Sequence, residues 1–157
     1  MTGKKLNKLL KDKPGSSSAE REKIAQAIAI FEQDIGEAVG TESDKRGTFR
    51  ILEDNDNSKY NQQFQQDCVD ETTNTTTYLI LLDQMGLLHY HTPGFPVNRS
   101  PTLSAPWWHR SATIVEKETQ AQYVVDSWFH DNGKAAEIVS VAAWKDGWNP
   151  PKNKTVN

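Results

Sequence analysis

The sequence predicts an α+β fold in which a small antiparallel sheet packs against helices. Two stretches in the first half place apolar residues at helical spacing. In the second half, short runs rich in Val, Ile, Tyr and Trp are separated by turn residues. The two clearest of these runs are joined by a short connection, so we expect them to form an antiparallel hairpin.

Length and composition indicate one folded domain. The chain has 157 residues, 36 % of them hydrophobic, and includes five Trp among its 14 aromatic residues. A chain of this length buries a substantial core, and its aromatic content argues against general disorder. No run of apolar residues is long enough to span a membrane, and the N-terminus lacks the apolar segment of a signal peptide. We therefore expect a cytoplasmic protein.

Positive charge is concentrated at the N-terminus. The formal net charge is −3, yet residues 1–13 contribute +4, which leaves the remaining chain near −7. An acidic body of this kind makes general nucleic-acid binding an unlikely function. We expect residues 1–16 to form a flexible basic arm, residues 17–148 to form the single domain, and residues 149–157 to form a polar tail.

The first helix is predicted over residues 18–39. Ser17 and Glu20 have the spacing of a capping box, and Gly40 is a natural helix stop. The apolar residues repeat at intervals of three and four, which places them on one face. They are Ile24, Ile28, Phe31 and Ile35.

The polar segment 40–66 contains an alternating run of Asp and Asn at residues 54–58. Such a run suggests calcium, but it lacks the glycine and the downstream glutamate of an EF-hand loop. A turn is the better interpretation.

The second helix is predicted from Cys68 to Met85 and ends at Gly86. Asp67 is a good N-cap, and Asp70 is an acid in the first turn, where the helix dipole favours negative charge. The expected apolar stripe consists of Val69, Thr73, Leu79 and Leu82.

Cys68 is the only cysteine, which excludes an internal disulfide and a cysteine-based zinc cluster. A lone buried cysteine is most often a small hydrophobic residue. In the first turn of a helix, however, the positive end of the dipole stabilises the thiolate, which is the reactive form.

Residues 87–91 are predicted to form a short strand, followed by a long irregular loop over residues 92–106 that contains four prolines. On such a strand His89 and His91 face the same way, so together with His109 they could bind a metal ion. A pair of histidines on one face is more often a surface feature.

The hairpin is predicted from strands 110–116 and 122–129, with a turn at 118–119. With an even-numbered turn, odd positions on the first strand share a face with even positions on the second. His109 and Asp126 would then lie side by side. A turn of odd length would place them on opposite faces. After the hairpin, residues 137–141 suit a strand, residues 142–144 suit a short helix that ends at Gly147, and the tail from Asn149 is expected to be loose.

Cys68, His109 and Asp126 together match the needs of cysteine-based acyl chemistry. A thiolate attacks a carbonyl, an imidazole keeps the thiolate ionised and protonates the leaving group, and a carboxylate orients the imidazole. The sequence therefore predicts that the fold brings these three residues together.

At these residues the sequence resembles the transglutaminase-like branch of the papain-like superfamily. The resemblance covers residues 66–128 and includes the separations of 41 and 17 residues between the cysteine, histidine and aspartate. Its pieces are residues 67–71 opening a helix, residues 82–87 closing it, residues 108–109 opening a strand, and residues 123–126 closing the next strand. The chain departs from that family at Ser127, where transglutaminases usually carry proline.

The resemblance implies that Cys68 is the nucleophile, His109 the general base and acid, and Asp126 the orienting group. The Cys68 backbone N–H and the Gln62 side chain would form the oxyanion hole, although Gln63, Gln65 and Gln66 compete for the latter role. It also implies a papain-like core that holds the cysteine at a helix N-terminus.

The expected function is that of a cysteine hydrolase or acyltransferase acting on an amide or thioester, with a peptide or protein amide as substrate. The alternative is a catalytically inactive binding module on the same scaffold. Trp107, Trp108 and Trp128 either wall the cleft or pack in the core, and His130 is expected in a turn. No cofactor and no membrane partner are expected, and the oligomeric state is left open.

Overall fold

The fold is α+β and contains a four-stranded antiparallel sheet with the strand order β1-β2-β3-β4. This computed structural model describes residues 2–47 and 66–151. The expected turn at 54–58, the candidate oxyanion residue Gln62 and the tail residues 152–157 lie outside the described residues.

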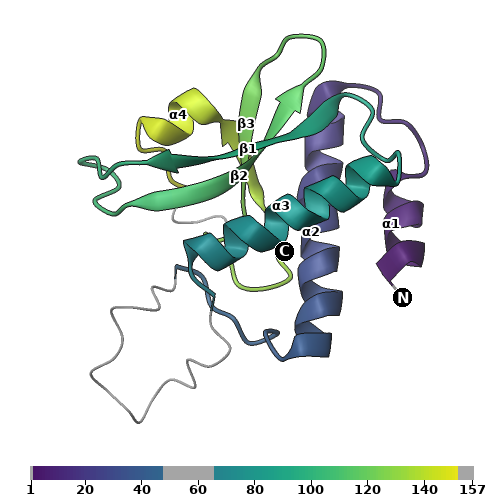
Figure 1. Ribbon diagram of the computed structural model, residues 1–157, viewed down its shortest axis with the longest axis horizontal. Helices are drawn as coiled ribbons and strands as arrows, with labels where there is room; N and C mark the ends of the chain where they lie inside the picture. The colour runs from purple at the N-terminus through teal and green to yellow at the C-terminus, as the bar shows by residue number, and fades with distance from the viewer. Residues whose placement is uncertain (1, 48–65, 152–157) are drawn as a thin grey trace.

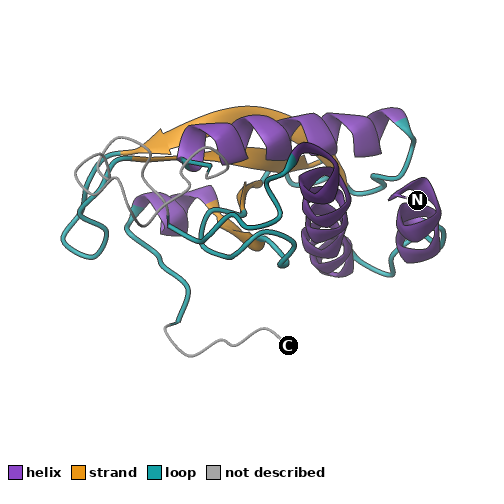
Figure 2. Ribbon diagram, turned by 90° about the horizontal axis from the view of Figure 1, so that it is seen from below, coloured by secondary structure: helices purple, strands orange, loops and turns teal. Residues whose placement is uncertain are grey.

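Four helices accompany the sheet in the described part of the chain. In Figure 1, α3 runs along the sheet, α2 lies across the end of α3, and α1 lies beside α2. In Figure 2, α3 runs along the sheet at the top of the view, α4 lies below it, and α2 is seen almost end-on beside α1. The helices are α1 (Thr2–Leu10), α2 (Ser17–Val39), α3 (Cys68–Gln84) and α4 (Val141–Lys145); the strands are β1 (His91–Arg99), β2 (His109–Glu116), β3 (Gln122–Asp126) and β4 (Glu137–Ser140).

The hydrophobic core lies between the sheet and the first three helices. Its buried side chains come from α1, α2 and α3 and from the central strands β2 and β3, because each of these presents one apolar face to the others. The fully buried members include Leu6, Leu10, Ile24, Ile28, Leu79, Leu82, Ala112 and Ile114. No helix among the described residues is both long and apolar enough to cross a membrane.

The expected flexible arm is wrong for residues 2–10, which form α1. Leu6 and Leu10 are four residues apart, so a helix places both on one face, and both are buried against the core. Lys5 lies on the exposed side and forms a 2.6 Å ion pair with Asp34 of α2. The lysines that suggest a solvated tail are therefore the outer face of an amphipathic helix.

Helix α2 matches its predicted range and its stop at Gly40, which has a φ of 88°. Its N-cap is Ser16 rather than Ser17, and the Ser16 side chain accepts the N–H of Ala19 at 3.1 Å. Glu20 therefore does not close the expected capping box. It is fully buried and accepts hydrogen bonds from the segment before β1.

Helix α3 begins at Cys68 and ends before Gly86, as predicted. Its buried face differs from the expected stripe, because Val69 and Thr73 are exposed. The inward face instead carries several polar side chains, which the fold pairs with partners on other elements. It comprises Cys68, Glu71, Thr72, Thr75, Tyr78, Leu79 and Leu82.

Strand β1 lies where the sequence predicts an irregular loop, and residues 87–90 are not a strand. Proline is tolerated here because β1 is an edge strand and donates few ladder hydrogen bonds. The register shifts between Gly94 and Val97, which marks a bulge. Gly94 approaches Thr113 so closely that a Cβ there would lie 2.3 Å from its hydroxyl oxygen.

The hairpin, β4 and α4 lie close to their predicted ranges, although β3 ends at Asp126 rather than at residue 129. The expected loose tail is wrong for Asn149, whose amide donates to the Ser104 carbonyl at 3.0 Å. Asn149 also accepts from Arg99 at 3.4 Å, so this segment is tied to β1.

Candidate active site

The three predicted site residues lie at the ends of three elements. Cys68 is the first residue of α3, His109 is the first of β2, and Asp126 is the last of β3. The start of α3 is fixed by Asp67, whose carboxylate accepts the N–H groups of Val69 and Asp70 at 2.8 and 3.1 Å. This capping fixes the position of the cysteine at the mouth of the helix.

The hairpin register brings the histidine and the aspartate together. Ala112 pairs with Val125 and Thr113 with Val124, so odd positions on β2 face even positions on β3, as the 118–119 turn predicts. His109 Nε2 lies 2.8 Å from Asp126 Oδ2. Both side chains are almost completely buried, and water therefore screens this interaction little.

A second donor, Trp144, binds the same oxygen of Asp126 as His109 does. The indole Nε1–H of Trp144 donates to the same oxygen, Asp126 Oδ2, at 2.8 Å. A carboxylate that accepts from both groups requires a proton on His109 Nε2. The other ring nitrogen, Nδ1, is buried and has no hydrogen-bond partner among the described residues.

Cys68 lies beside the imidazole of His109 and affects its protonation. Burial alone would lower the pKa of His109, but the hydrogen bond and charge of Asp126, with smaller contributions of both kinds from Cys68, raise the pKa above its ordinary value. Since Nε2 is held by Asp126, Nδ1 is the nitrogen available to the thiol. The three groups thus form a sequence of sulfur, imidazole and carboxylate.

Arg99 places a buried positive charge near this site. It stands opposite His109 in the β1–β2 register, and its guanidinium donates to the carbonyl oxygens of Trp144 and Trp148 at 3.0 and 2.8 Å. Burial lowers the pKa of Arg99, while the charge of Asp126 raises it.

Aromatic side chains enclose the imidazole of His109. The ring centroids of Trp128, Trp144 and Phe129 lie 4.5, 5.4 and 5.5 Å from that of His109. His109 is fully buried, and only 7 % of Cys68 is exposed. The enclosure excludes water from the His109–Asp126 pair. Of the three residues, Cys68 has the largest exposed fraction.

The backbone supplies one candidate donor for a developing oxyanion. The Cys68 N–H belongs to the first turn of α3, where no carbonyl of the same helix can accept it. Asp67 accepts from Val69 and Asp70 instead. This N–H fits the expected oxyanion donor, whereas Gln62 lies outside the described residues.

The alternative in which His89, His91 and His109 bind one metal ion does not fit the structure. His91 pairs with Glu116 at one end of the β1–β2 ribbon, and His109 pairs with Arg99 at the other. The buried imidazole of His91 binds Glu20 through Nδ1 at 2.7 Å. Among the described residues, no group of three or more potential ligands could hold a metal ion.

A buried cluster of three carboxyl groups lies beneath the start of α3. The Ser127 hydroxyl donates to Glu71 at 2.6 Å and also contacts Thr75. Burial raises the pKa of Glu32 to about 7 and raises that of Glu71 well above its ordinary value; the pKa of Asp44 is raised for the same main reason. Mutual repulsion adds to these shifts, so the cluster retains protons near neutral pH.

Sequence reasoning missed Arg99 and Trp144. Arg99 lies in the proline-rich segment that the sequence predicts as a loop, and Trp144 lies in a short helix with no polar pattern. A weak signal was available, because an arginine placed between prolines and far from other charges has no local partner.

Comparisons of the chain with protein-family models, with curated proteins and with solved structures give no match.

Proposed function

We propose that the protein is a cysteine hydrolase or acyltransferase that uses Cys68, His109 and Asp126 on an amide or thioester substrate. The proposal is supported by two observations: Asp126 holds His109 through Nε2, and Cys68 is near enough to contribute to the raised pKa of that imidazole. This arrangement assigns a nucleophile, a base and an orienting group to the three side chains.

The chemistry follows from the positions of the protons. His109 Nδ1 takes the proton of the thiol, and the sulfur attacks the substrate carbonyl carbon, which forms a C–S bond and moves the π electrons to oxygen. The Cys68 N–H donates to that oxygen. When the carbonyl re-forms, the C–N bond breaks, and the leaving amine takes the proton from Nδ1.

The second half of the reaction releases the acyl group. Water attacks the thioester carbonyl while Nδ1 accepts one of its protons, and the C–S bond breaks with the electron pair returning to sulfur. An amine in place of water would give acyl transfer. Asp126 stabilises the imidazolium in each half, because its carboxylate accepts a hydrogen bond from the Nε2–H of His109 throughout.

The proposed scaffold is a transglutaminase-like or papain-like core. Its support is the chain order of Cys, His and Asp, the cysteine at a helix start, and the antiparallel hairpin that carries the other two residues. These features agree with the resemblance in residues 66–128.

The alkylation rate of Cys68 by iodoacetamide tests the proposal. We expect the folded protein to react faster at pH 6.5 than the same chain in urea, because the imidazole stabilises the thiolate. Mass spectrometry locates the adduct, and Cys68→Ala is the blank. Folded protein that reacts more slowly than unfolded chain throughout, and accelerates only above about pH 8.5, contradicts the proposal.

The burial of the site favours a second candidate, a binding module without catalysis. Only 7 % of Cys68 is exposed, and Trp128 lies against the His109 ring. A module of this kind would keep its cellular role when Cys68 is replaced by alanine. An enzyme would lose that role, so the phenotype of Cys68→Ala separates the two functions.

A further inference from the structure

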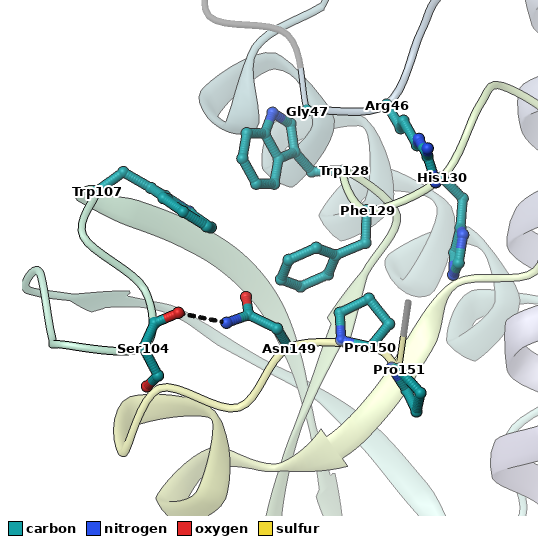
Figure 3. Close-up of a pocket in the computed structure, with 10 residues that line it drawn as sticks. All are labelled: Arg46, Gly47, Ser104, Trp107, Trp128, Phe129, His130, Asn149, Pro150 and Pro151. Atoms are coloured by element: carbon teal, nitrogen blue, oxygen red, sulfur yellow. Dashed lines mark hydrogen bonds between the residues drawn. The ribbon is translucent and has the colours of Figure 1, made fainter. Parts of the chain in front are cut away.

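A pocket of about 730 Å³ lies next to the proposed active site (Figure 3). This volume is within the range of about 300–1,000 Å³ that is typical of ligand pockets. Trp128 is one of its walls, and the same indole contacts the ring of His109. Trp107 and Phe129 also line the pocket, and Arg46 lies at its rim.

Hydrogen bonds hold both rims of this pocket in place. On one side, the N–H groups of Arg46 and Gly47 donate to Asp131 and to the Trp128 carbonyl at 3.1 and 2.9 Å. On the other, Asn149 donates to the Ser104 carbonyl at 3.0 Å. The pocket is therefore framed by tertiary hydrogen bonds that join segments far apart in the sequence.

Most polar side chains that line the pocket already form hydrogen bonds with other groups of the protein. The Ser104 hydroxyl donates to the Gly147 carbonyl at 3.1 Å, and the side-chain oxygen of Asn149, Oδ1, accepts from the guanidinium of Arg99. What remains for a ligand is apolar: the rings of Trp107, Trp128 and Phe129, shown around the pocket in Figure 3 together with the prolines at 150–151. Surfaces of this kind bind large apolar or aromatic side chains.

Arg46 adds one positive charge at the rim. The other charged groups nearby are paired with one another: Asp131 lies 3.7 Å from Lys45, and His130 lies 2.9 Å from Glu137. No described carboxylate forms an ion pair with the Arg46 guanidinium. The charge of this rim thus favours an anionic group on a ligand whose apolar part fills the pocket.

Trp107 supplies a third feature. Its indole Nε1–H is buried and has no acceptor among the described residues. A buried donor without a partner is unfavourable, and this one belongs to an indole that lines the pocket. The aromatic walls and the rim cation together favour a ligand that has an aromatic part and an anionic part.

We propose that this pocket binds the peptide segment beside the bond to be cleaved, and that it selects an aromatic residue followed by an acidic one. The inference rests on the proposed function for the choice of a peptide, because Trp128 joins the pocket to His109. Arg46 is then a specificity-determining residue, and Trp107, Trp128 and Phe129 form the aromatic subsite.

The test measures peptide binding without catalysis. Full-length Cys68→Ala protein is titrated, at low salt, with the N-acetylated and C-terminally amidated dipeptides Phe-Glu, Phe-Gln and Ala-Glu, and binding is followed by tryptophan fluorescence, since two tryptophans line the pocket. We expect Phe-Glu to bind most tightly. Replacing its aromatic ring should weaken binding about tenfold, and removing its charge should weaken binding about three- to fivefold.

Two variants in the Cys68→Ala background assign the charge preference. Arg46→Gln should make Phe-Glu and Phe-Gln bind equally. Lys45→Gln removes the neighbouring charge, which does not line the pocket, and should keep the preference. No saturable binding of any peptide, or equal binding of all three, overturns the proposal. A preference that survives Arg46→Gln overturns the role of Arg46.

The alkylation experiment keeps this proposal separable from the proposed function. Activated Cys68 without peptide binding would refute the pocket and leave the enzyme. Selective peptide binding with an unactivated thiol would refute the enzyme and leave a peptide-binding module.

Discussion

The two ends of the β1–β2 ribbon each hold a buried histidine bound to a carboxylate. His109 and Asp126 are 2.8 Å apart at one end, and His91 and Glu20 are 2.7 Å apart at the other. All four side chains are at least nine-tenths buried. A histidine–carboxylate pair is therefore not by itself the mark of an active site in this protein.

The second ring nitrogen makes the difference between the two ends. His91 Nε2 lies 3.3 Å from the guanidinium of Arg21, so a neutral imidazole accepts a hydrogen bond there and both nitrogens are occupied. His109 Nδ1 has no hydrogen-bond partner among the described residues, and Cys68 contributes to the raised pKa of its ring. The first arrangement joins α2 to β1, whereas the second leaves one ring nitrogen unpaired.

The largest expected effect comes from replacing His109 and His91 in turn and comparing the alkylation rate of Cys68 in the two variants. We expect His109→Gln to lower the alkylation rate of Cys68 at pH 7 by about 100-fold or more, because the thiolate loses its imidazole. His91→Gln should leave that rate unchanged wherever the variant is folded, as circular dichroism will show. Equal losses in both variants would mean that the two ends do not differ in function.

Glu20→Ala should have the largest effect on stability. Glu20 accepts from the N–H groups of His89 and Tyr90 at 2.6 and 2.8 Å and from the buried ring of His91, so its removal leaves three donors without their acceptor. We expect the free energy of unfolding in urea to fall by about 3–5 kcal/mol. Glu22→Ala, on the exposed side of the same helix, is the matched control and should change stability little.

This loss should depend on pH in a defined direction. Burial raises the pKa of Glu20, but the hydrogen bonds from His91, His89 and Tyr90 outweigh it, and the net pKa is lowered. A lowered acid pKa contributes stability above the unfolded value of 4.5 that is lost as the pH falls through the folded value. The difference between wild type and Glu20→Ala should therefore shrink below about pH 4.5.

Glu32 should show the opposite dependence, because its carboxyl group has no histidine to pair with. Its pKa is raised to about 7, so the folded state binds more protons than the unfolded state, and stability declines as the pH rises from 4.5 to 7. Glu32→Gln should stabilise the protein by up to about 3 kcal/mol more at pH 8 than at pH 5. Glu37→Gln is the exposed control on α2, and an equal gain there would contradict the buried carboxyl cluster.

The smallest expected effect concerns the anchoring of Asp126. Trp144→Phe keeps the aromatic ring against His109 but removes the indole N–H that donates to Asp126. We expect a several-fold slower alkylation of Cys68, equivalent to about 1 kcal/mol for one hydrogen bond. Trp148→Phe is the control, and an equal decrease in that variant would show that the Trp144 bond has no specific role.

The sequence predicted regular structure well where the pattern is local. The helix over residues 18–39, the helix from Cys68 to Gly86 and the parity of the hairpin follow from spacings of three, four and two residues. The failures occur where local rules conflict with packing. The prolines of β1 suggest a loop, but an edge strand tolerates them. The lysines of α1 suggest a solvated tail, but the same segment has two leucines that pack in the core.

For the candidate site, the sequence was sufficient to select three residues but not their surroundings. His109 and Asp126 are 17 residues apart in one hairpin, so a turn with an even number of residues, as predicted at 118–119, places them on one face. Arg99 and Trp144 are 45 residues apart, and no spacing rule relates them. Their convergence on Asp126 depends on how β1 and α4 pack at the end of the sheet.

The sequence by itself determined the helix that begins at the cysteine and the ribbon that pairs a histidine with an aspartate, because both depend on neighbours within a few residues or across one turn. Only the tertiary structure decided which histidine faces a thiol and which faces an arginine. That choice depends on burial and on partners brought from distant segments, and periodicity carries no information about either.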